Sequence, residues 1–532
     1  MREHFSNTGK LIRFILRRER IISAIWLLCL VVFSVFLAGG MSAMFDRNER
    51  MVLAETLKNP GMIAMMGPVY GADNYTVGAM YSNTMFLWVA IAVAAMNFFL
   101  VTRHTRDDEE NGRAEVIRSL PTGRLATLNA TMITALIVNS LLAVGTGLGI
   151  AVQGIEAMDF AGSMLYGAAL GAVGLFFAAA AAVFSQLSVS SRGAIVYSFS
   201  TLFVIYMIRA AGDIGNETLS LISPLGLVQR SKLFVENNCL PVIIVIAEAI
   251  AVAAAAYILN AVRDIDRGFI TAGPGRKEAS VLLRSSSGLA VRLLRNSIIG
   301  WIIILFALSA SYGAILADID AFVSESDFYR MVIGVSDDYT ILEMFTATAN
   351  IIGAIVALVP MLIIALKPRS EEKEGRAEGI LARSVSRIKY IAGYTAPAFA
   401  ASVLFQLATA FGLYASSAAV LDEPISLAYL LRANLVFLPA QWVMIGIAVF
   451  LTGLLPKITG AIWAYFAFSF FTEFIGRMLN IPEWLPKTTP FGYTPQLPVD
   501  EIDPAALVAL IGIAAVLTIS GFVLFKRRDV TT

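Results

Sequence analysis

The segment EENGRAEVIRSLPTGR, residues 109–124, lies between two long apolar runs and carries three acids and three arginines. A similar segment, EKEGRAEGILARSVSR, follows at residues 372–387. We name them the first and the second charged segment. Their shared core, Gly-Arg-Ala-Glu, begins at Gly112 and at Gly375. Because one motif returns half a chain later, we predict an internal duplication.

The composition around these segments is that of a membrane protein. Of 532 residues, 58% are hydrophobic and only 15% are charged, whereas soluble domains carry about 25% charged residues. Apolar stretches of about 20 residues, long enough to cross a bilayer as helices, recur along the chain. Since lipid offers the backbone no hydrogen bonds, such stretches must be helical. We predict an all-α polytopic membrane protein.

Twelve stretches qualify as spans, which predicts a tandem arrangement of six and six. They lie near 21–39, 81–101, 127–152, 163–187, 192–211, 242–261, 297–317, 345–366, 390–415, 434–453, 460–478 and 505–525. Further landmarks recur in the same order: Arg17, Arg20 and Trp26 with Arg292, Arg295 and Trp301; Gly193-Ala194-Ile195 with Gly460-Ala461-Ile462; Pro224 and Gly226 with Pro490 and Gly492; Arg263-Asp264 with Arg528-Asp529. An even number of spans gives both copies the same orientation, as in a pseudo-dimer.

The predicted domains are a first six-helix unit (1–270), a linker with an interfacial helix (271–296) and a second six-helix unit (297–532). Basic and apolar residues alternate over residues 10–20 and late in the linker. This pattern predicts an interfacial helix before the first span of each copy. An equivalent helix in mid-chain argues against a signal peptide at the N-terminus. Lys and Arg concentrate in segments that share one side, which predicts cytoplasmic termini.

Several classes of function are disfavoured. Cys29 and Cys239 cannot form a disulfide framework, and His4 and His104 are too few and too isolated for a metal site or a catalytic triad. The pair Gly9-Lys10 lacks the context of a nucleotide-binding loop. A net charge of +1 does not suggest nucleic acid. We expect no enzyme, and no cofactor on this chain.

Ionisable residues inside spans are functional candidates, and Glu248 and Glu473 are the clearest, with Arg209 and Arg477 at outer ends. Buried pairing or snorkelling is the plainer explanation of them. Aromatic clusters suit either ordinary packing or the wall of a path for hydrophobic cargo. The candidate pathway residues are Tyr81, Phe86, Trp88, Tyr197, Tyr206, Asn350, Phe466, Phe470 and Glu473.

In helical geometry the charged segments predict ion pairs four residues apart, Glu109 with Arg113 and Glu372 with Arg376, each worth only about 0.2–0.5 kcal/mol. Glycine is unfavourable inside a helix, so the shared glycines indicate a bend or a close neighbouring backbone. A solvated loop with Arg124 and Arg387 at the headgroups explains the arginines but not the acids. We therefore favour a docking surface, with these candidates: Glu109, Glu110, Gly112, Arg113, Glu115, Arg124, Glu372, Lys373, Gly375, Arg376, Glu378 and Arg387.

The E-E-x-G-R-x-E run, the outer Ser/Thr-Pro-x-Gly segments (223–226 and 489–492) and the R-D-I-D-R-G run from Arg263 resemble permease subunits of ABC-2-type exporters. The likeness is strongest to the polyketide-antibiotic and tetronasin-resistance exporters and covers nearly the whole chain. It implies a pseudo-dimer whose charged segments are coupling helices for two copies of a separate ATPase, which binds the ATP and Mg. It also implies a path lined by spans one, two and five of one copy and seven, eight and eleven of the other.

The resemblance further implies export of hydrophobic or amphipathic compounds across the bacterial plasma membrane, within membrane lipid. Glu110 becomes Lys373 and Pro121 becomes Ser384 between the copies, which leaves the equivalence of the two sites open. Two alternatives remain. An ion-coupled secondary transporter with 12 spans usually carries several charges inside its spans in both halves. A sensory or scaffold protein usually has a larger outer domain.

Overall fold

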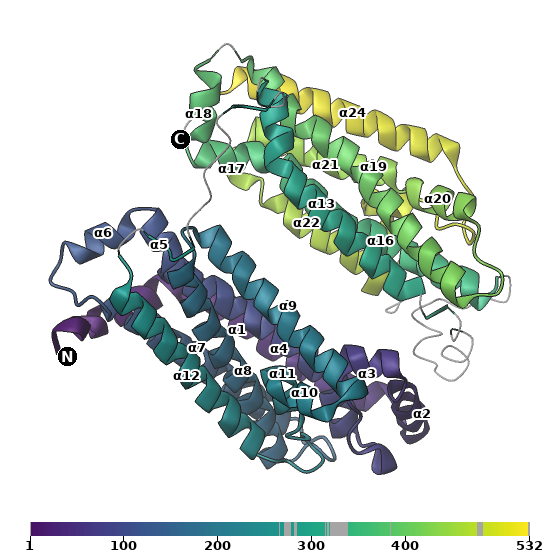
Figure 1. Cartoon of the computed structure of the whole chain (residues 1–532). Coiled ribbons are helices and arrows are strands. Elements are labelled where there is room, and N and C mark those ends of the chain that lie inside the picture. The colour runs from purple at the N-terminus through teal and green to yellow at the C-terminus, as the bar shows by residue number, and fades with distance from the viewer. Residues whose placement is uncertain are drawn as a thin grey trace. The chain divides into compact units, whose positions relative to one another are not determined.

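The computed structural model describes residues 2–529 except 265–266, 271–277, 281–282, 284, 314, 317–318, 320–338, 384, 476–481 and 483. The chain divides into two compact units, Met1–Pro274 and Gly275–Thr532. Apart from a single isolated bridge between Ser188 and Ile270, the regular structure of the described residues is helical (Figure 1). This agrees with the all-α prediction.

The described residues of the first unit form six long helices and several short ones, and Figure 1 shows how they are arranged. The long helices are α1 (Thr8–Met44), α4 (Val77–His104), α7 (Ala126–Ala151), α8 (Phe160–Leu187), α9 (Ser191–Gly215) and α12 (Leu240–Val262). The short ones are α2 (Arg47–Leu57), α3 (Pro60–Met66), α5 (Arg106–Glu110), α6 (Arg113–Arg118), α10 (Glu217–Ile222) and α11 (Pro224–Gln229).

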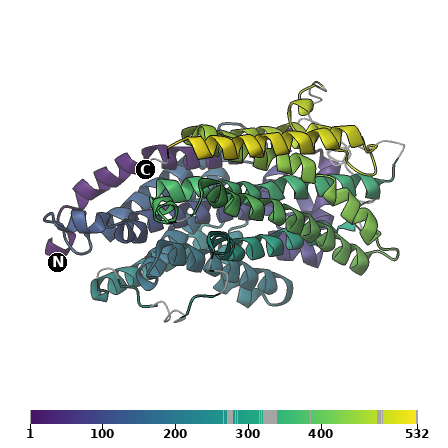
Figure 2. The ribbon, with the colours of Figure 1, turned by 90° about the horizontal axis from the view of Figure 1, so that it is seen from above.

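The second unit repeats this order where it is described. Its helices are α13 (Ser286–Gly313), α16 (Ile341–Ala365), α17 (Lys367–Lys373), α18 (Arg376–Leu381), α19 (Arg387–Val420), α20 (Leu427–Leu435), α21 (Leu438–Leu454), α22 (Ala461–Phe470) and α24 (Pro504–Arg527). Figure 2 shows α24, in yellow, running lengthwise beside the green helices of its own unit.

Eleven helices of the described residues are long and apolar enough to span a membrane, and they match eleven of the twelve predicted spans. The remaining prediction, 460–478, falls on α22 and on the π-helical turn Phe471–Ile475 that follows it. Its last residues, including Arg477, lie outside the described residues. A count of twelve therefore stays a prediction.

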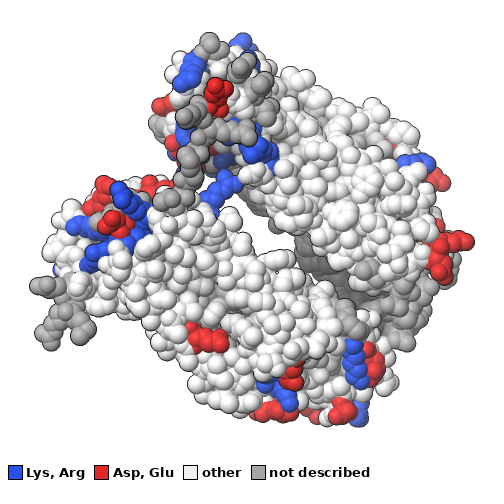
Figure 3. All heavy atoms as spheres, viewed as in Figure 1, with Lys and Arg blue, Asp and Glu red and all other residues white. Residues whose placement is uncertain are grey.

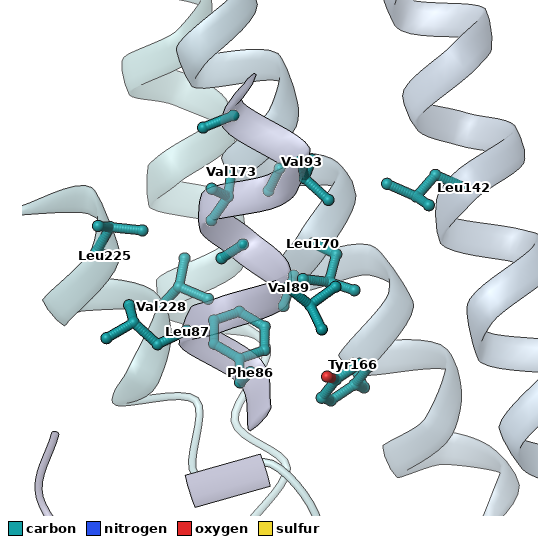
Figure 4. Close-up of a cluster of buried hydrophobic side chains, with 14 of the residues drawn as sticks. Phe86, Leu87, Val89, Val93, Leu142, Tyr166, Leu170, Val173, Leu225 and Val228 are labelled. Atoms are coloured by element: carbon teal, nitrogen blue, oxygen red, sulfur yellow. The ribbon is translucent and has the colours of Figure 1, made fainter. Parts of the chain in front are cut away.

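The core of the first unit is built around α4 and α8, the most buried of its spans. Figure 4 shows Phe86 and Val89 of α4 facing Leu170 and Val173 of α8, with Leu225 of α11 beyond them. Close approach of α7 and α8 depends on a missing side chain, because a Cβ at residue 167 would lie 2.1 Å from the Ala143 carbonyl oxygen. Small residues commonly permit such contacts between membrane helices.

The predicted separate interfacial helix at residues 10–20 is not found. These residues are the first turns of α1, which continues without interruption for 37 residues, about 55 Å at 1.5 Å per residue. Leu11 and Ile15 there are buried against Ala126 and Ala130 at the start of α7. Packing within the unit therefore covers Leu11 and Ile15, whereas Phe14 in the same turns is 51% exposed.

Charged side chains gather at the ends of the helices. In Figure 3 most blue and red atoms lie toward the ends of each unit, and the flanks between them are white apart from one red group on the lower unit. The exposed residues of α1 and α12 include Leu28, Phe36, Ile243 and Ile250. An uncharged flank of this kind is what the hydrocarbon layer requires.

Candidate functional site

Each charged segment, with the few residues before it, folds as two short helices with a glycine between them: α5, Gly112 and α6 in the first, and α17, Gly375 and α18 in the second. From here on the two charged segments are taken to include all of α5 and all of α17. Both glycines have a φ of 70°, a left-handed conformation that only glycine adopts readily. A Cβ at residue 112 would meet no atom within 4 Å. The glycines therefore make a bend, and at Gly112 the alternative of a close neighbouring backbone is wrong.

The bend overturns the predicted pairs between Glu109 and Arg113 and between Glu372 and Arg376, which assumed an unbroken helix. The Glu109 carboxylate instead lies 2.5 Å from the Arg263 guanidinium, directly after α12, and 2.6 Å from Arg106. Its side chain is only 9% exposed, and that of Arg263 only 4%. Glu109 thus anchors the first charged segment to the end of α12.

The second charged segment has the same anchor. Both oxygens of Glu372 accept hydrogen bonds from Arg528, directly after α24, at 2.6 and 2.7 Å. Arg369 contributes a weaker contact at 3.7 Å. The Glu372 side chain is 2% exposed, so it faces inward as Glu109 does.

Arg124 and Arg387 reinforce these anchors. Arg124 donates a hydrogen bond of 2.8 Å to the backbone carbonyl of Arg263, and Arg387 donates to the backbone carbonyl of Arg528. The sequence predicted that both would anchor the next span at the headgroups. In the structure each joins the start of the third span of its unit to the end of the last one.

A second matched pair stabilises the bend itself. Arg113 contacts Asp108 at 2.9 Å across Gly112, and Arg376 contacts Glu371 at 2.6 Å across Gly375. The hydrogen bonds that Glu371 accepts raise the pKa of Arg376 above its ordinary value. Each arginine thus closes its bend with the acid that precedes the anchoring glutamate.

Beyond these anchors, each segment leaves charges exposed. Glu110, Arg113 and Glu115 are exposed in the first segment, and Lys373, Arg376 and Glu378 in the second. A hollow of about 290 Å³ lies beside the first segment and is lined by Arg106, Glu109, Glu110, Gly112, Glu115 and Val189. Three carboxylates line it against one arginine, so its chemistry suits a cationic side chain.

The candidate pathway residues occupy different environments. Tyr81, Phe86 and Asn350 are buried within their own units. Tyr81 and Phe86 pack against Tyr166, with ring centres 5.1 and 5.5 Å apart. Asn350 accepts a hydrogen bond of 3.0 Å from Asn434. These three side chains contribute to packing.

The other candidates, apart from buried Glu473, lie nearer the surfaces of their units. Trp88 is 46% exposed, and Tyr197, Phe466 and Phe470 are half-buried. The Tyr206 hydroxyl donates a hydrogen bond of 2.8 Å to the carbonyl of Met65. Glu473, 6% exposed, lies in the π-helical turn after α22. The contribution of these residues to a pathway stays a prediction.

The C-terminal end of α9 holds an ion network that sequence reasoning missed. Arg209 is fully buried and contacts Asp213 at 3.1 Å, and Arg230 approaches the same carboxylate at 3.6 Å. Arg209 also donates to the carbonyls of Ala64 and Met65 in α3, at 2.5 and 3.3 Å. The four-residue spacing of Arg209 and Asp213 was the available signal. This buried pairing supports the plainer explanation of Arg209.

Sequence reasoning also missed the anchoring role of Arg263 and Arg528. They stood out only as landmarks of the duplication, because nothing local indicates a partner 154 or 156 residues away. Their recurrence at matched places was a usable signal. The acids Asp108 and Glu371 escaped notice for another reason, because Arg113 and Arg376 lie five residues further on and an unbroken helix would not bring such residues together.

Apolar spans, uncharged flanks and charged ends define a multi-pass helical membrane protein. The chain matches the family model described as "Multidrug efflux system permease Rv1217c, C-terminal domain" over residues 10–259 and 283–526, one stretch in each unit. It is also 32% identical over 534 residues to the multidrug efflux system permease protein Rv1217c of Mycobacterium tuberculosis (strain ATCC 25618 / H37Rv). That match covers 99% of this chain and 96% of the relative. The chain belongs to this family of efflux permeases.

Proposed function

We propose that the chain is the membrane permease subunit of an ATP-driven exporter of the ABC-2 type. Two copies of a separate ATPase would dock on the two charged segments and bind the ATP and Mg. The observation that carries this proposal is the matched anchoring of both segments, Glu109 on Arg263 and Glu372 on Arg528. A solvated loop has no need of such anchors, whereas a segment that receives a force does.

The geometry divides the candidate docking residues into two groups. Glu109 and Glu372 are buried and hold the segments in place. Glu115 and Glu378 are exposed on α6 and α18, where a partner can reach them. Force applied to the exposed helices would pass through the buried glutamates to the ends of α12 and α24.

The hollow beside the first segment adds a specific contact. Glu109, Glu110 and Glu115 line it, so we expect the ATPase to insert a lysine or arginine there. Complementary charges of this kind steer association and fix its register.

The cargo we propose is a hydrophobic or amphipathic compound such as an antibiotic, moved outward. The similar protein of Mycobacterium tuberculosis is named a multidrug efflux permease. Half-exposed Trp88 and the half-buried aromatics of α22 are the residues we would place along the path. Apolar and aromatic walls suit such compounds.

We further propose a bacterial plasma membrane location with both termini cytoplasmic. Near the N-terminus, Asn7 donates a hydrogen bond of 2.6 Å to the carbonyl of Pro121 in the first charged segment. Near the C-terminus, Arg528 holds the second segment. Each terminus therefore lies on the side of its own charged segment, where the ATPase must bind.

Glu248 favours the alternative of an ion-coupled transporter. One of its carboxylate oxygens is buried and has no hydrogen-bond partner among the described residues, which suits a proton site inside a span. Transport that requires ATP and a second polypeptide, and that persists with an uncoupler present, would exclude this alternative.

The docking proposal is tested by reversing exposed charges in both segments, Glu115→Lys with Glu378→Lys. We expect the ATPase to stop co-purifying, because juxtaposed like charges cost several kcal/mol at an interface. The matched control is Glu55→Lys with Glu236→Lys, two exposed glutamates in the connections after α1 and before α12. Co-purification of the charge-reversed chain at the wild-type level would show the docking idea to be wrong, and native mass spectrometry of the wild-type complex would count the ATPase copies.

A further inference from the structure

The two charged segments are not connected to their units in the same way. The difference begins at Glu19, which lies on α1 just before its apolar part and is 2% exposed. Its carboxylate is 2.8 Å from Arg103 and 2.9 Å from Nε2 of His104, both in the last turn of α4. A buried carboxylate persists only when it is paired, so Glu19 holds α1 firmly to α4.

The neighbouring residue extends this link to the charged segment. Arg18 donates hydrogen bonds of 2.8 Å to both oxygens of Asp108 in α5. Asp108, 4% exposed, also faces Nδ1 of His104 at 3.7 Å and Arg113 at 2.9 Å. Arg18 and Glu19 together clamp α1 across the junction of α4 and α5, and we call them the α1 clamp.

The second copy lacks the residues of the α1 clamp. In the alignment of the two copies that matches Arg17 with Arg292, Leu293 corresponds to Arg18 and Leu294 to Glu19. Leu294 is buried in the apolar core of its unit. Lys367, in the place of His104, contacts only the local acid Glu371, at 2.9 Å, among the ion pairs of the described residues.

Both segments also have apolar contacts with their units, so the difference that matters here is ionic. Ile117 of α6 packs against the cluster of Leu11, Ile15, Ala126 and Ala130, and Ile380 of α18 packs against the large apolar core of the second unit, which includes Leu294. Apolar contacts are not directional, whereas hydrogen bonds between charged groups are short, strong and directional. Among the described residues, the first copy has such bonds between its first span and the charged segment, from Arg18 to Asp108, and no counterpart is found in the second copy.

The first segment is also joined to the start of α9. Arg106 donates two hydrogen bonds, of 2.8 and 2.6 Å, to the carbonyl of Val189. Glu110 accepts hydrogen bonds from the backbone N–H and the hydroxyl of Ser191, at 2.8 and 2.6 Å. In the second copy Lys373 replaces Glu110, and an ammonium group cannot accept those bonds.

We infer that the α1 clamp is a positioning device that fixes α1 relative to the first charged segment. A movement of that segment is therefore transmitted to the first span more rigidly than in the second copy. Because α1 is one continuous helix, a displacement at residues 18 and 19 moves its apolar part as well. The second segment is anchored mainly on Arg528, so its displacement moves its own first span less. This inference rests on the proposed docking function and adds that the two docking events are unequal in effect.

The test is Glu19→Leu, which gives the first copy the residue of the second, in the full chain reconstituted with its ATPase. Co-purification should be unchanged, while cargo-stimulated ATP hydrolysis falls about fivefold or more, the lower end of typical coupling between sites. Glu19→Gln keeps hydrogen bonding to Arg103 and His104. Its fall in cargo-stimulated ATP hydrolysis should be less than half of the fall in Glu19→Leu. Leu293→Arg, a charge added at the matching site of the second copy, is the control and should change nothing.

A covalent replacement separates positioning from folding. Arg18→Cys with Asp108→Cys, in a chain whose Cys29 and Cys239 are changed to Ser, can be joined by a short bifunctional thiol reagent. Joining should restore coupling in the Glu19→Leu chain, and cleavage of the reagent should abolish it again. Normal coupling in Glu19→Leu, or no restoration by the linker, would overturn the inference. Failure of the docking proposal has another signature, because either the chain with Glu115→Lys and Glu378→Lys then still co-purifies with the ATPase, or the wild-type chain binds no ATPase.

Discussion

The anchors of the two charged segments predict an unequal response to one substitution. We consider Arg263→Met and Arg528→Met, which remove the guanidinium but keep a long apolar side chain. After Arg528→Met, buried Glu372 retains, among the cations of the described residues, only Arg369, at 3.7 Å. A buried charge that loses its partner destabilises by about 3–5 kcal/mol. The second segment should therefore detach readily from α24.

Arg263→Met should be milder, because Glu109 keeps Arg106 at 2.6 Å. The loss is then one hydrogen bond between charged groups, about 1.5–3 kcal/mol. The two substitutions differ by about 2 kcal/mol, close to a 30-fold difference in the local opening equilibrium. The larger loss of stability is thus expected in the second segment, although the two segments share a sequence motif.

Hydrogen exchange of the purified chain measures this directly. Amides of α17 and α18 should lose more protection in Arg528→Met than amides of α5 and α6 lose in Arg263→Met. Arg527→Met, at an exposed neighbour, is the control and should leave protection unchanged. Equal losses in the two segments, or an Arg528→Met chain that behaves as the control does, would refute the reasoning.

Three other outcomes are expected. Replacing Gly112 or Gly375 by Ala should destabilise its segment by about 1–2 kcal/mol, which is the cost of a left-handed conformation, and replacement by Asn should cost less. Hydrogen exchange of the segment amides distinguishes the two variants, and equal protection in the Ala and Asn chains would contradict the conformational argument. Arg209→Met should lower the melting temperature, because buried Asp213 loses its nearer cation and keeps the weaker contact with Arg230 at 3.6 Å; the cost is up to about 3–5 kcal/mol. Adding Asp213→Leu should recover part of the loss, and a double variant no more stable than the single one would contradict this. Glu110→Gln should weaken the contact with the start of α9 by about 0.3–1 kcal/mol, seen as faster exchange there, and an unchanged rate would argue against that contact.

The sequence by itself determined the class of the protein and the places of its spans. Apolar length alone requires a helix in lipid, so eleven predicted spans recur as helices. It also located the charged segments and the matched residues, including Arg263 and Arg528, through their recurrence.

Only the tertiary structure decided which charges meet. Local spacing assigned Glu109 to Arg113, but a left-handed glycine ends the helix between them and a partner 154 residues away takes the carboxylate. The same limit hid the α1 clamp, because Arg18 and Asp108 lie 90 residues apart. Helical periodicity reports neighbours within a few turns, and the desolvation that selects partners for a buried charge depends on the packing of distant helices.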